Sequence, residues 1–148
     1  MIIVGDYQIK SEPLIDLTQK NQRLESIINA VEEYVMENRQ KAIIKGKPLE
    51  VFHVSGLASQ HAPRLTHYLN HKILKNYSDQ AQVEQGSFAN YPGRHYWIEI
   101  NDLIIDLGFK QFADKRINVL NSLRPFLQYY CFISNNSQNP FYRMYRKD

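Results

Sequence analysis

The sequence predicts an α+β fold, with one domain spanning residues 1–148. Apolar residues recur at helical spacing in two stretches of the first half, and alternating strand-like segments dominate the second half. The resulting order of helix, strand, helix and then mainly strands is typical of helices packed on a mainly antiparallel sheet. A chain of 148 residues that is 43% hydrophobic is large enough to build one ordinary core.

The first part of the chain predicts a short strand at Ile2–Val4 followed by a long helix. Asp16 lies three residues before Gln19, which predicts a capping box at the start of the helix. The helix is expected to end near Arg39, before a turn at 45–48. Its apolar stripe consists of Leu24, Ile27, Ile28, Val31, Tyr34 and Val35.

A second helix is expected after a short strand at 49–54. Five apolar residues then fall within a narrow arc of a helix, which predicts a buried face. These residues are Ala58, Ala62, Leu65, Leu69 and Ile73. Pro63 is tolerated best in an opening turn, so we expect either a distorted first turn or a later start of the regular helix.

The second half predicts strands at 80–88, 95–100, 103–107 and 127–134. The segments 95–100 and 103–107 carry the strongest strand pattern, and residues 101–102 join them. From Asn135 onward the sequence is typical of a loop with aromatic and basic residues.

Composition narrows the classes of protein. The formal net charge of +3 is too small to argue for a nucleic-acid partner, so none is expected. Cys131 is the single cysteine, and it therefore cannot form an internal disulfide, which favours a reducing compartment. No apolar run has the length of a membrane span and no secretory signal is visible. These features predict a cytoplasmic protein without a membrane partner.

Residues 95–107 predict a β-hairpin with its turn at 101–102. Such a turn pairs residue 100 with 103, residue 98 with 105 and residue 97 with 106. One face of the hairpin is then strongly apolar and is expected to pack against a helix. That face carries Tyr96, Ile98, Ile100, Leu103, Ile105 and Leu107.

The opposite face of the hairpin gathers His95, Trp97, Glu99, Ile104 and Asp106, because side chains alternate along a strand. Asp106 is a diagonal neighbour of His95, at about 7–8 Å between Cα atoms, which is within reach of a carboxylate–imidazole hydrogen bond. Such a bond orients a catalytic imidazole. The alternative is a histidine and an acid at strand ends without a catalytic role, and geometry alone slightly favours that alternative.

The string HYWIEINDLIID resembles the His-x-Trp-x-Glu…Asp stretch of the transglutaminase-like branch of the papain-like superfamily. The continuation IDLGF is similar to the Asp-Val-Gly-Phe segment of arylamine N-acetyltransferases, which belong to the same superfamily. The resemblance covers roughly residues 50 to 110. It implies a papain-like or transglutaminase-like fold in which His95 is the general base and Asp106 orients it.

The resemblance also implies a cysteine nucleophile at the start of the second helix, where the helix N-terminus and the histidine favour the thiolate. Counting from Gly56, that position is Ala58. Three explanations remain open: an inactive form with cysteine replaced by alanine, a natural pseudoenzyme that kept the scaffold for binding, or a serine nucleophile at Ser59 or, second to it, Ser55. The inactive form is favoured because the rest of the pattern is intact.

The expected activity is acyl transfer from an amide of a protein or peptide substrate, by a Cys-His-Asp triad without cofactor or metal. Water as acceptor gives a peptidase, amidase or deamidase, and an amine as acceptor gives a transglutaminase. The small size fits a processing enzyme or a delivered bacterial effector. Two alternatives remain: an arylamine N-acetyltransferase-like enzyme that uses an acyl-coenzyme A, and a non-catalytic binding module.

Other residues are candidates with weaker arguments. Ser59, Gln60, His61 and Trp97 are expected to line the site, with Gln60 a candidate oxyanion donor. Cys131 lies in an aromatic segment and is expected to be a buried structural cysteine. His67 and His71 are spaced i, i+4, as two metal ligands can be, but a solvated helix face is the better interpretation.

Overall fold

The computed structural model describes residues 2–4, 7–9, 12–44, 46, 57–112 and 124–148, and within these ranges no side chain is described at 2–4, 7–9, 42–44, 57–59, 110, 125 or 129–130. Its helices are α1 (Gln22–Ile44), α2 (Leu57–Lys72) and α3 (Pro125–Tyr130), with short 3-10 helices η2 (Phe109–Gln111) and η3 (Tyr142–Met144). Its strands are β1 (Ile2–Val4), β2 (Tyr7–Ile9), β3 (Ile15–Asp16), β4 (Gln82–Phe88), β5 (His95–Ile100), β6 (Leu103–Asp106), β7 (Phe132–Ser134) and β8 (Tyr145–Lys147).

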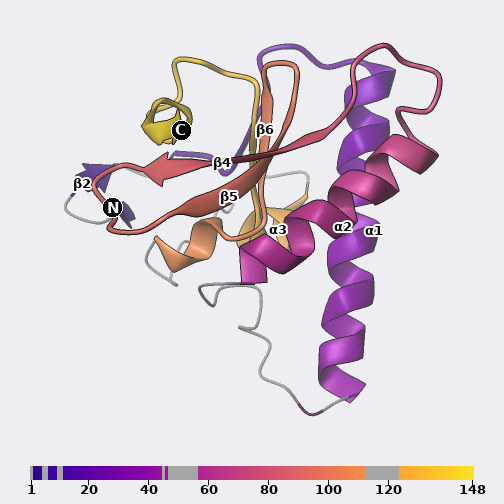
Figure 1. The fold of residues 1–148 in the computed structure, drawn as a ribbon, viewed down its shortest axis with the longest axis horizontal. Helices are drawn as coiled ribbons and strands as arrows, with labels where there is room; N and C mark the ends of the chain where they lie inside the picture. The colour runs from indigo at the N-terminus through magenta and orange to yellow at the C-terminus, as the bar shows by residue number, and fades with distance from the viewer. Residues whose placement is uncertain (1, 5–6, 10–11, 45, 47–56, 113–123) are drawn as a thin grey trace.

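Six of these strands form one sheet in the order β3-β7-β6-β5-β4-β8. All neighbouring pairs in it are antiparallel except β3 and β7, which run parallel. Strands β1 and β2 form a separate antiparallel pair. The α+β class and the mainly antiparallel sheet predicted from the sequence are therefore confirmed. Figure 1 shows α1 and α2 crossing each other beside this sheet.

Helix α1 begins later than the sequence pattern predicts. The proposed capping box at Asp16 and Gln19 is wrong, because Asp16 lies in β3 and pairs with Ser134. The cap is supplied by Asn21, whose Oδ1 accepts a hydrogen bond of 2.9 Å from the backbone N–H of Leu24. The helix also runs past the expected end at Arg39, to Ile44.

Helix α2 begins at Leu57, close to the predicted start, and carries Pro63 in its interior. The ring of Pro63 has no N–H to donate, so the helix continues through it without one i to i−4 hydrogen bond. Of the two alternatives expected for this helix, the late regular start is wrong, because the helix already begins at Leu57. The predicted strand at 49–54 lies outside the described residues.

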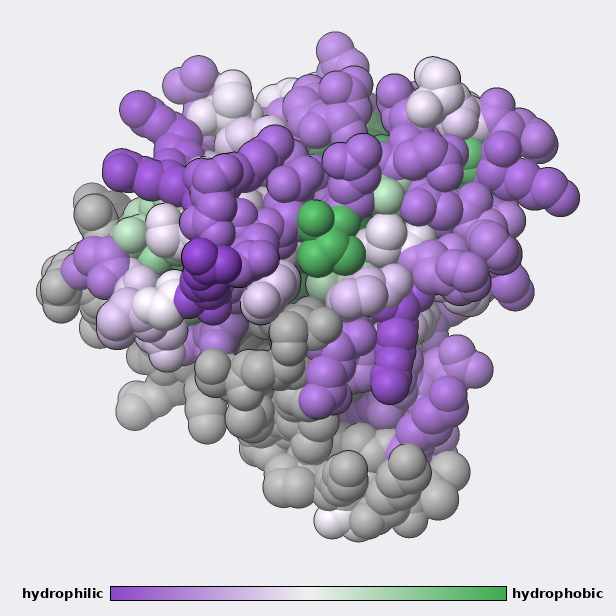
Figure 2. Space-filling model, viewed as in Figure 1, coloured by the Kyte–Doolittle hydropathy of each residue, from purple (hydrophilic) through white to green (hydrophobic). Residues whose placement is uncertain are grey.

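The sheet separates two apolar clusters. The helix-side cluster joins α1, α2 and α3 to one face of the sheet, and Val31, Leu65, Leu69, Ile98 and Ile105 in it are completely buried. The aromatic cluster covers the other face and consists of Leu14, Phe88, Trp97, Ile104, Phe109, Phe112, Phe132 and Phe141. With these side chains inside, the molecular face seen in Figure 2 is mostly hydrophilic, with only small hydrophobic areas.

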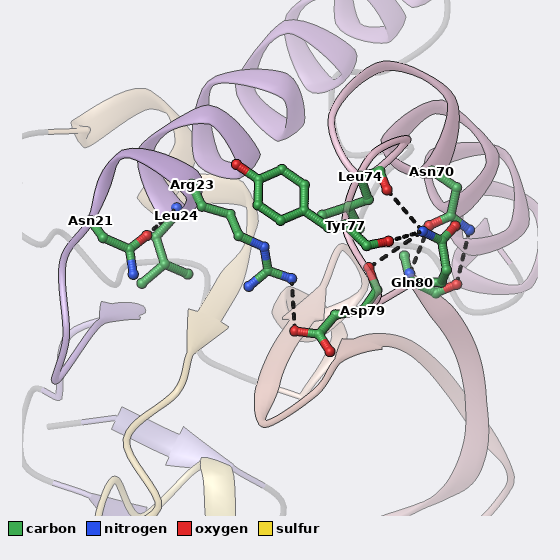
Figure 3. Close-up of polar contacts among 9 residues, drawn as sticks. Asn21, Arg23, Leu24, Asn70, Leu74, Tyr77, Asp79 and Gln80 are labelled. Carbon is green, nitrogen blue, oxygen red and sulfur yellow. Dashed lines mark hydrogen bonds and ion pairs between the residues drawn. The ribbon is translucent and has the colours of Figure 1, made fainter.

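The connection between α2 and β4 is held by side-chain amides (Figure 3). Asn70 makes two hydrogen bonds to the backbone of Ala81, accepting at 2.7 Å from its N–H and donating at 3.0 Å to its carbonyl. Gln80 donates to the carbonyl of Leu74 at 2.8 Å. Arg23 of α1 pairs with Asp79 at 3.3 Å, so this connection is also attached to the first helix.

The C-terminal part differs most from the sequence prediction. Residues 127–134 were predicted as one strand, but only Phe132–Ser134 are extended, and Pro125–Tyr130 form α3. Pro125 occupies the first turn of that helix, where its missing N–H costs nothing. The predicted loop from Asn135 onward contains η3 and β8, and β8 pairs with β4 as an edge strand of the sheet.

No helix in the described ranges combines the length and apolar character needed to cross a membrane.

Candidate functional site

The predicted hairpin is present as β5 and β6. Ile100 pairs with Leu103 and Ile98 with Ile105, as the sequence predicts. The turn takes the left-handed backbone conformation at Asn101, with φ 57°, which asparagine tolerates better than most residues. Because this register is correct, the two faces of the hairpin are also as predicted.

The central feature of the site is a buried pair of His95 and Asp106. His95 Nε2 lies 2.6 Å from Asp106 Oδ2, which confirms the predicted hydrogen bond across the hairpin. The exposed fraction is 4% for the His95 side chain and 0% for that of Asp106. A buried imidazole–carboxylate pair of this length is held in one orientation, since neither group has water as an alternative partner.

Two further donors converge on Asp106. The backbone N–H of Gly108 donates to Oδ1 at 2.8 Å, and the hydroxyl of Tyr145 donates to Oδ2 at 2.5 Å. Burial, followed by the charge of Asp106 and this hydrogen bond, raises the pKa of Tyr145 well above its ordinary value, so the hydroxyl keeps its proton. The carboxylate therefore acts only as an acceptor, and His95 is its third donor.

The second ring nitrogen of His95 also has a partner. The amide Nε2 of Gln111, at the end of η2, lies 3.1 Å from His95 Nδ1. With Nε2–H donated to Asp106, Nδ1 carries the lone pair and accepts from this amide. Nδ1 is thus the basic nitrogen of the pair, and the Gln111 amide occupies it.

Aromatic rings enclose the pair. The ring of Phe112 meets the imidazole edge-on at 4.6 Å between centroids, and the ring of Trp97 lies 6.0 Å from it. Trp97 is 1% exposed, and its indole N–H donates to Glu99 at 3.1 Å. Glu99 in turn pairs with Lys147 of β8 at 2.7 Å. Trp97 is therefore a buried neighbour of His95, held in place by its hydrogen bond to Glu99.

The start of α2 carries the other predicted site residues. Ala58 and Ser59 lie in its first turn, as expected, but their side chains are outside the described part of the chain. Gln60 is exposed to solvent. The described apolar residues of α2, Ala62 and Leu65 among them, pack in the helix-side cluster, across the sheet from His95.

His61 is directed toward the first helix. Its Nδ1 lies 2.8 Å from the hydroxyl of Tyr34 in α1, and the two rings meet edge-on with their centroids 5.8 Å apart. Burial, and then the charge of Arg64, lower the pKa of His61. Burial is also the main reason why the pKa of Tyr34 is raised to about 12. The structure therefore brings His61 to Tyr34, on the helix side of the sheet.

We expect Tyr34→Phe to make stability less dependent on alkaline pH. The pKa of Tyr34 rises from 10.0 to about 12 on folding, so its contribution to the free energy of unfolding is complete below pH 10 and is lost as the pH rises to 12. The unchanged protein should therefore lose on the order of 2 kcal/mol of stability over this pH range, and the variant should not. Urea unfolding across this pH range measures it. Tyr77→Phe, at an exposed tyrosine, is the control, and parallel curves for Tyr34→Phe and the unchanged protein would contradict the expectation.

Cys131 is buried, with 1% of its surface exposed, as predicted for a structural cysteine. Burial, and then the charge of Asp106, raise its thiol pKa well above the ordinary value. A thiol held in its protonated form is a poor nucleophile. Cys131 therefore does not replace the nucleophile expected at position 58.

Sequence reasoning missed Gly108, Gln111 and Tyr145 as members of the site. The Gly108 contact had a local signal, because an aspartate often accepts a hydrogen bond from the N–H two residues later. Gln111 had only its place shortly after the hairpin. Tyr145 lies 39 residues from Asp106 and had no local signal, because only the pairing of β8 with β4 brings it near.

Among the described residues no group of three or more His, Cys, Asp or Glu side chains is placed to hold a metal ion. The fold and site define an α+β protein with a buried histidine–aspartate pair at the base of a two-stranded hairpin. Comparison with protein-family models, with curated proteins and with solved structures gives no match.

Proposed function

We propose that this chain is a thiol-dependent acyl-transfer enzyme with a papain-like or transglutaminase-like fold, in a form that has alanine where the nucleophile belongs. The proposal rests on one observation, the 2.6 Å hydrogen bond between His95 Nε2 and Asp106 Oδ2. This bond leaves Nδ1 as the basic nitrogen, which is the arrangement that a general base oriented by a carboxylate needs. The substrate class is an amide of a protein or peptide.

In the active form a cysteine at position 58 attacks the amide carbonyl. Its thiol proton passes to His95 Nδ1, and the same nitrogen returns the proton to the leaving amine. Asp106 holds Nε2–H and stabilises the imidazolium while the proton resides on the ring. The amine leaves and the acyl group stays on the sulfur as a thioester. Water or an amine then attacks this thioester, its proton passes through His95 Nδ1 to the leaving sulfur, and the acyl group departs as an acid or as a new amide.

Two features of the structure constrain this chemistry. The amide of Gln111 lies 3.1 Å from Nδ1, so it has to move before a thiol reaches that nitrogen. In addition, the described part of α2 packs across the sheet from His95. A nucleophile in the first turn of α2 therefore has to reach the imidazole from the opposite side of the sheet.

The test is the reactivity of a thiol introduced by Ala58→Cys. If it is the nucleophile, His95 increases the thiolate fraction, and iodoacetamide should label it at pH 6 about tenfold faster than an ordinary thiol. Adding His95→Gln should abolish this advantage. Adding Gln111→Ala should raise the labelling rate further, because the amide no longer competes for Nδ1. Mass spectrometry of the modified peptides separates position 58 from the buried Cys131.

Ser59→Cys is the matched control, since it places the same thiol one residue further along the same helical turn, about 100° around the axis. Its thiol should label no faster than an ordinary thiol that has no activating histidine, and adding His95→Gln should leave its labelling rate unchanged. Circular dichroism of each variant verifies that it is folded. Equal rates for Ala58→Cys and Ser59→Cys, both insensitive to His95, would show that the pair does not activate a nucleophile at this position.

A second candidate function, a non-catalytic binding module, is favoured by the burial of the pair. His95 is 4% exposed and both of its ring nitrogens have partners, as in a histidine that stabilises a core. In this case the pair fixes the hairpin against β8 and the function resides elsewhere on the surface. The inert outcome of the labelling experiment supports this candidate.

A further inference from the structure

A groove of about 380 Å³ lies between α1 and α2, away from the His95–Asp106 pair. Its cationic and potentially cationic lining comes from both helices: Lys41 from α1, and Arg64, His67, His71 and Lys72 from α2. Glu37 is the acid among the lining residues. Three cations against one carboxylate give the groove a net charge of +2 before either histidine is protonated.

The charge of the protein is therefore unevenly distributed. A second hollow, near the start of β4 and the hairpin turn, has the opposite character, with Asp79, Glu84 and Glu99 against Lys147. The net charge of +3 over the whole sequence conceals both regions. A cleft lined mainly by one sign of charge raises the local concentration of ligands of the other sign.

Two acids lie near the cations of the groove, since Glu37 lines it and Glu33 accepts a hydrogen bond from Tyr68, but neither forms an ion pair with them in the described part of the chain. Among the described residues Lys41, Arg64 and Lys72 form no ion pair. In the acidic hollow, by contrast, Glu99 is already paired with Lys147. The positive charge also acts on the buried residue next to the groove, since Arg64 contributes, after burial, to the lowered pKa of His61. These cations are free to bind an anion from solution.

The walls of the groove are held in place. The hydroxyl of Tyr68 donates to Glu33 of α1 at 3.0 Å, which connects the two helices. Lys72 Nζ lies 5.2 Å from the centre of the Tyr68 ring, a cation–π arrangement that orients the ammonium group. The rings of His67 and His71 lie 4.1 Å apart, so two imidazoles can direct ring N–H groups toward one ligand. An anion would meet donors that are already oriented.

We propose that this groove binds a small organic phosphomonoester. A phosphate group carries a charge of about −1.5 to −2 at pH 7 and has three strong acceptor oxygens, which match a guanidinium, two ammonium groups and two imidazoles. Arg64 is suited to bidentate contact with phosphate oxygens, and the lysines act as point charges. A volume of 380 Å³ falls in the range of small-molecule sites and exceeds what a bare phosphate ion fills, so an organic group occupies the rest.

Isothermal titration calorimetry of the full chain tests this proposal, with adenosine 5′-monophosphate, ribose 5-phosphate, inorganic phosphate and uncharged adenosine as probes. At least one of the two phosphomonoesters should bind, more tightly than inorganic phosphate, and adenosine should not bind. Added sodium chloride should weaken binding, because the cations are exposed to solvent. The imidazole NMR signals of His67 and His71 should shift with the same dissociation constant.

Arg64→Gln and Lys72→Gln should each weaken binding about tenfold or more, the effect of losing a charged hydrogen bond. Lys75→Gln is the matched control, because Lys75 is an exposed lysine just after α2 and outside the groove. The proposal is overturned if neither phosphomonoester binds at millimolar concentration, if inorganic phosphate binds equally well, or if Arg64→Gln and Lys72→Gln behave like Lys75→Gln. None of these outcomes affects the labelling test of the acyl-transfer proposal.

Discussion

Replacing Asp106 by alanine is expected to destabilise the protein by about 3–5 kcal/mol, as when one partner of a buried charged pair is removed. Asp106 has no exposed surface and accepts from three donors: Gly108 N–H, His95 Nε2–H and the Tyr145 hydroxyl. The substitution leaves all three buried donors without the acceptor that they share. Urea unfolding at neutral pH, followed by circular dichroism, measures the loss.

Asp106→Asn gives this prediction a sharper form. The variant keeps the shape of the side chain but places an NH₂ group, itself a donor, where donors converge. It should therefore lose most of the stability that Asp106→Ala loses. Asp102→Ala is the control, because Asp102 is an exposed acid in the turn of the same hairpin, and it should cost less than about 0.5 kcal/mol. A neutral effect of Asp106→Asn would mean that the network does not stabilise the fold.

Replacing Gly86 by alanine is expected to displace β8 from the sheet and to cost about 3 kcal/mol. Gly86 pairs with Lys147, and a Cβ atom built on it would lie 1.9 Å from the carbonyl oxygen of Arg146. The neighbouring atoms belong to the backbone of β8, so no side-chain rotation relieves the overlap. Displacing β8 also removes the Tyr145 hydroxyl from Asp106. This hydrogen bond connects the β8 edge of the sheet to the candidate site.

Urea unfolding and amide hydrogen exchange of residues 145–147 together measure this effect. Gly86→Ala should lower the unfolding midpoint and accelerate exchange in β8, whereas Ser87→Ala, at the adjacent position of β4, should change neither by much. Ser87 pairs with Arg146 and already has a Cβ atom, so its truncation introduces no overlap. Slow exchange in β8 of the Gly86→Ala variant would contradict the close approach of the two strands.

The hairpin shows how much of the site local sequence predicts. Alternation of apolar and polar residues between 95 and 106 specified the two strands, their register and the face shared by His95 and Asp106, and each of these is confirmed. This success has a physical basis: a register error of one residue would place the isoleucines of the apolar face in the aromatic cluster and the charged residues in the helix-side cluster. The strong pattern therefore allowed one solution.

The prediction failed where local preference and tertiary packing disagree. The segment before Cys131 is rich in aromatic residues, which favours a strand, but it forms α3 because Leu127 and Cys131 bury their side chains in the helix-side cluster. Likewise, Asp16 has the spacing of a helix cap but pairs in β3, where Asn136 and Asn139 donate to its carboxylate. Such long-range partners leave no trace in a local pattern.

By itself, the sequence determined the α+β class, the two long helices, the hairpin and the His95–Asp106 pair, because helix and strand periodicity and a two-residue turn are local properties. Only the tertiary structure decided that Tyr145 and Gln111 complete the hydrogen bonds of the pair. It also decided that the C-terminal segment is an edge strand, and that a net charge of +3 is divided into a basic groove and an acidic hollow. These features join residues far apart in the chain, and only the packing of helices and sheet brings them together.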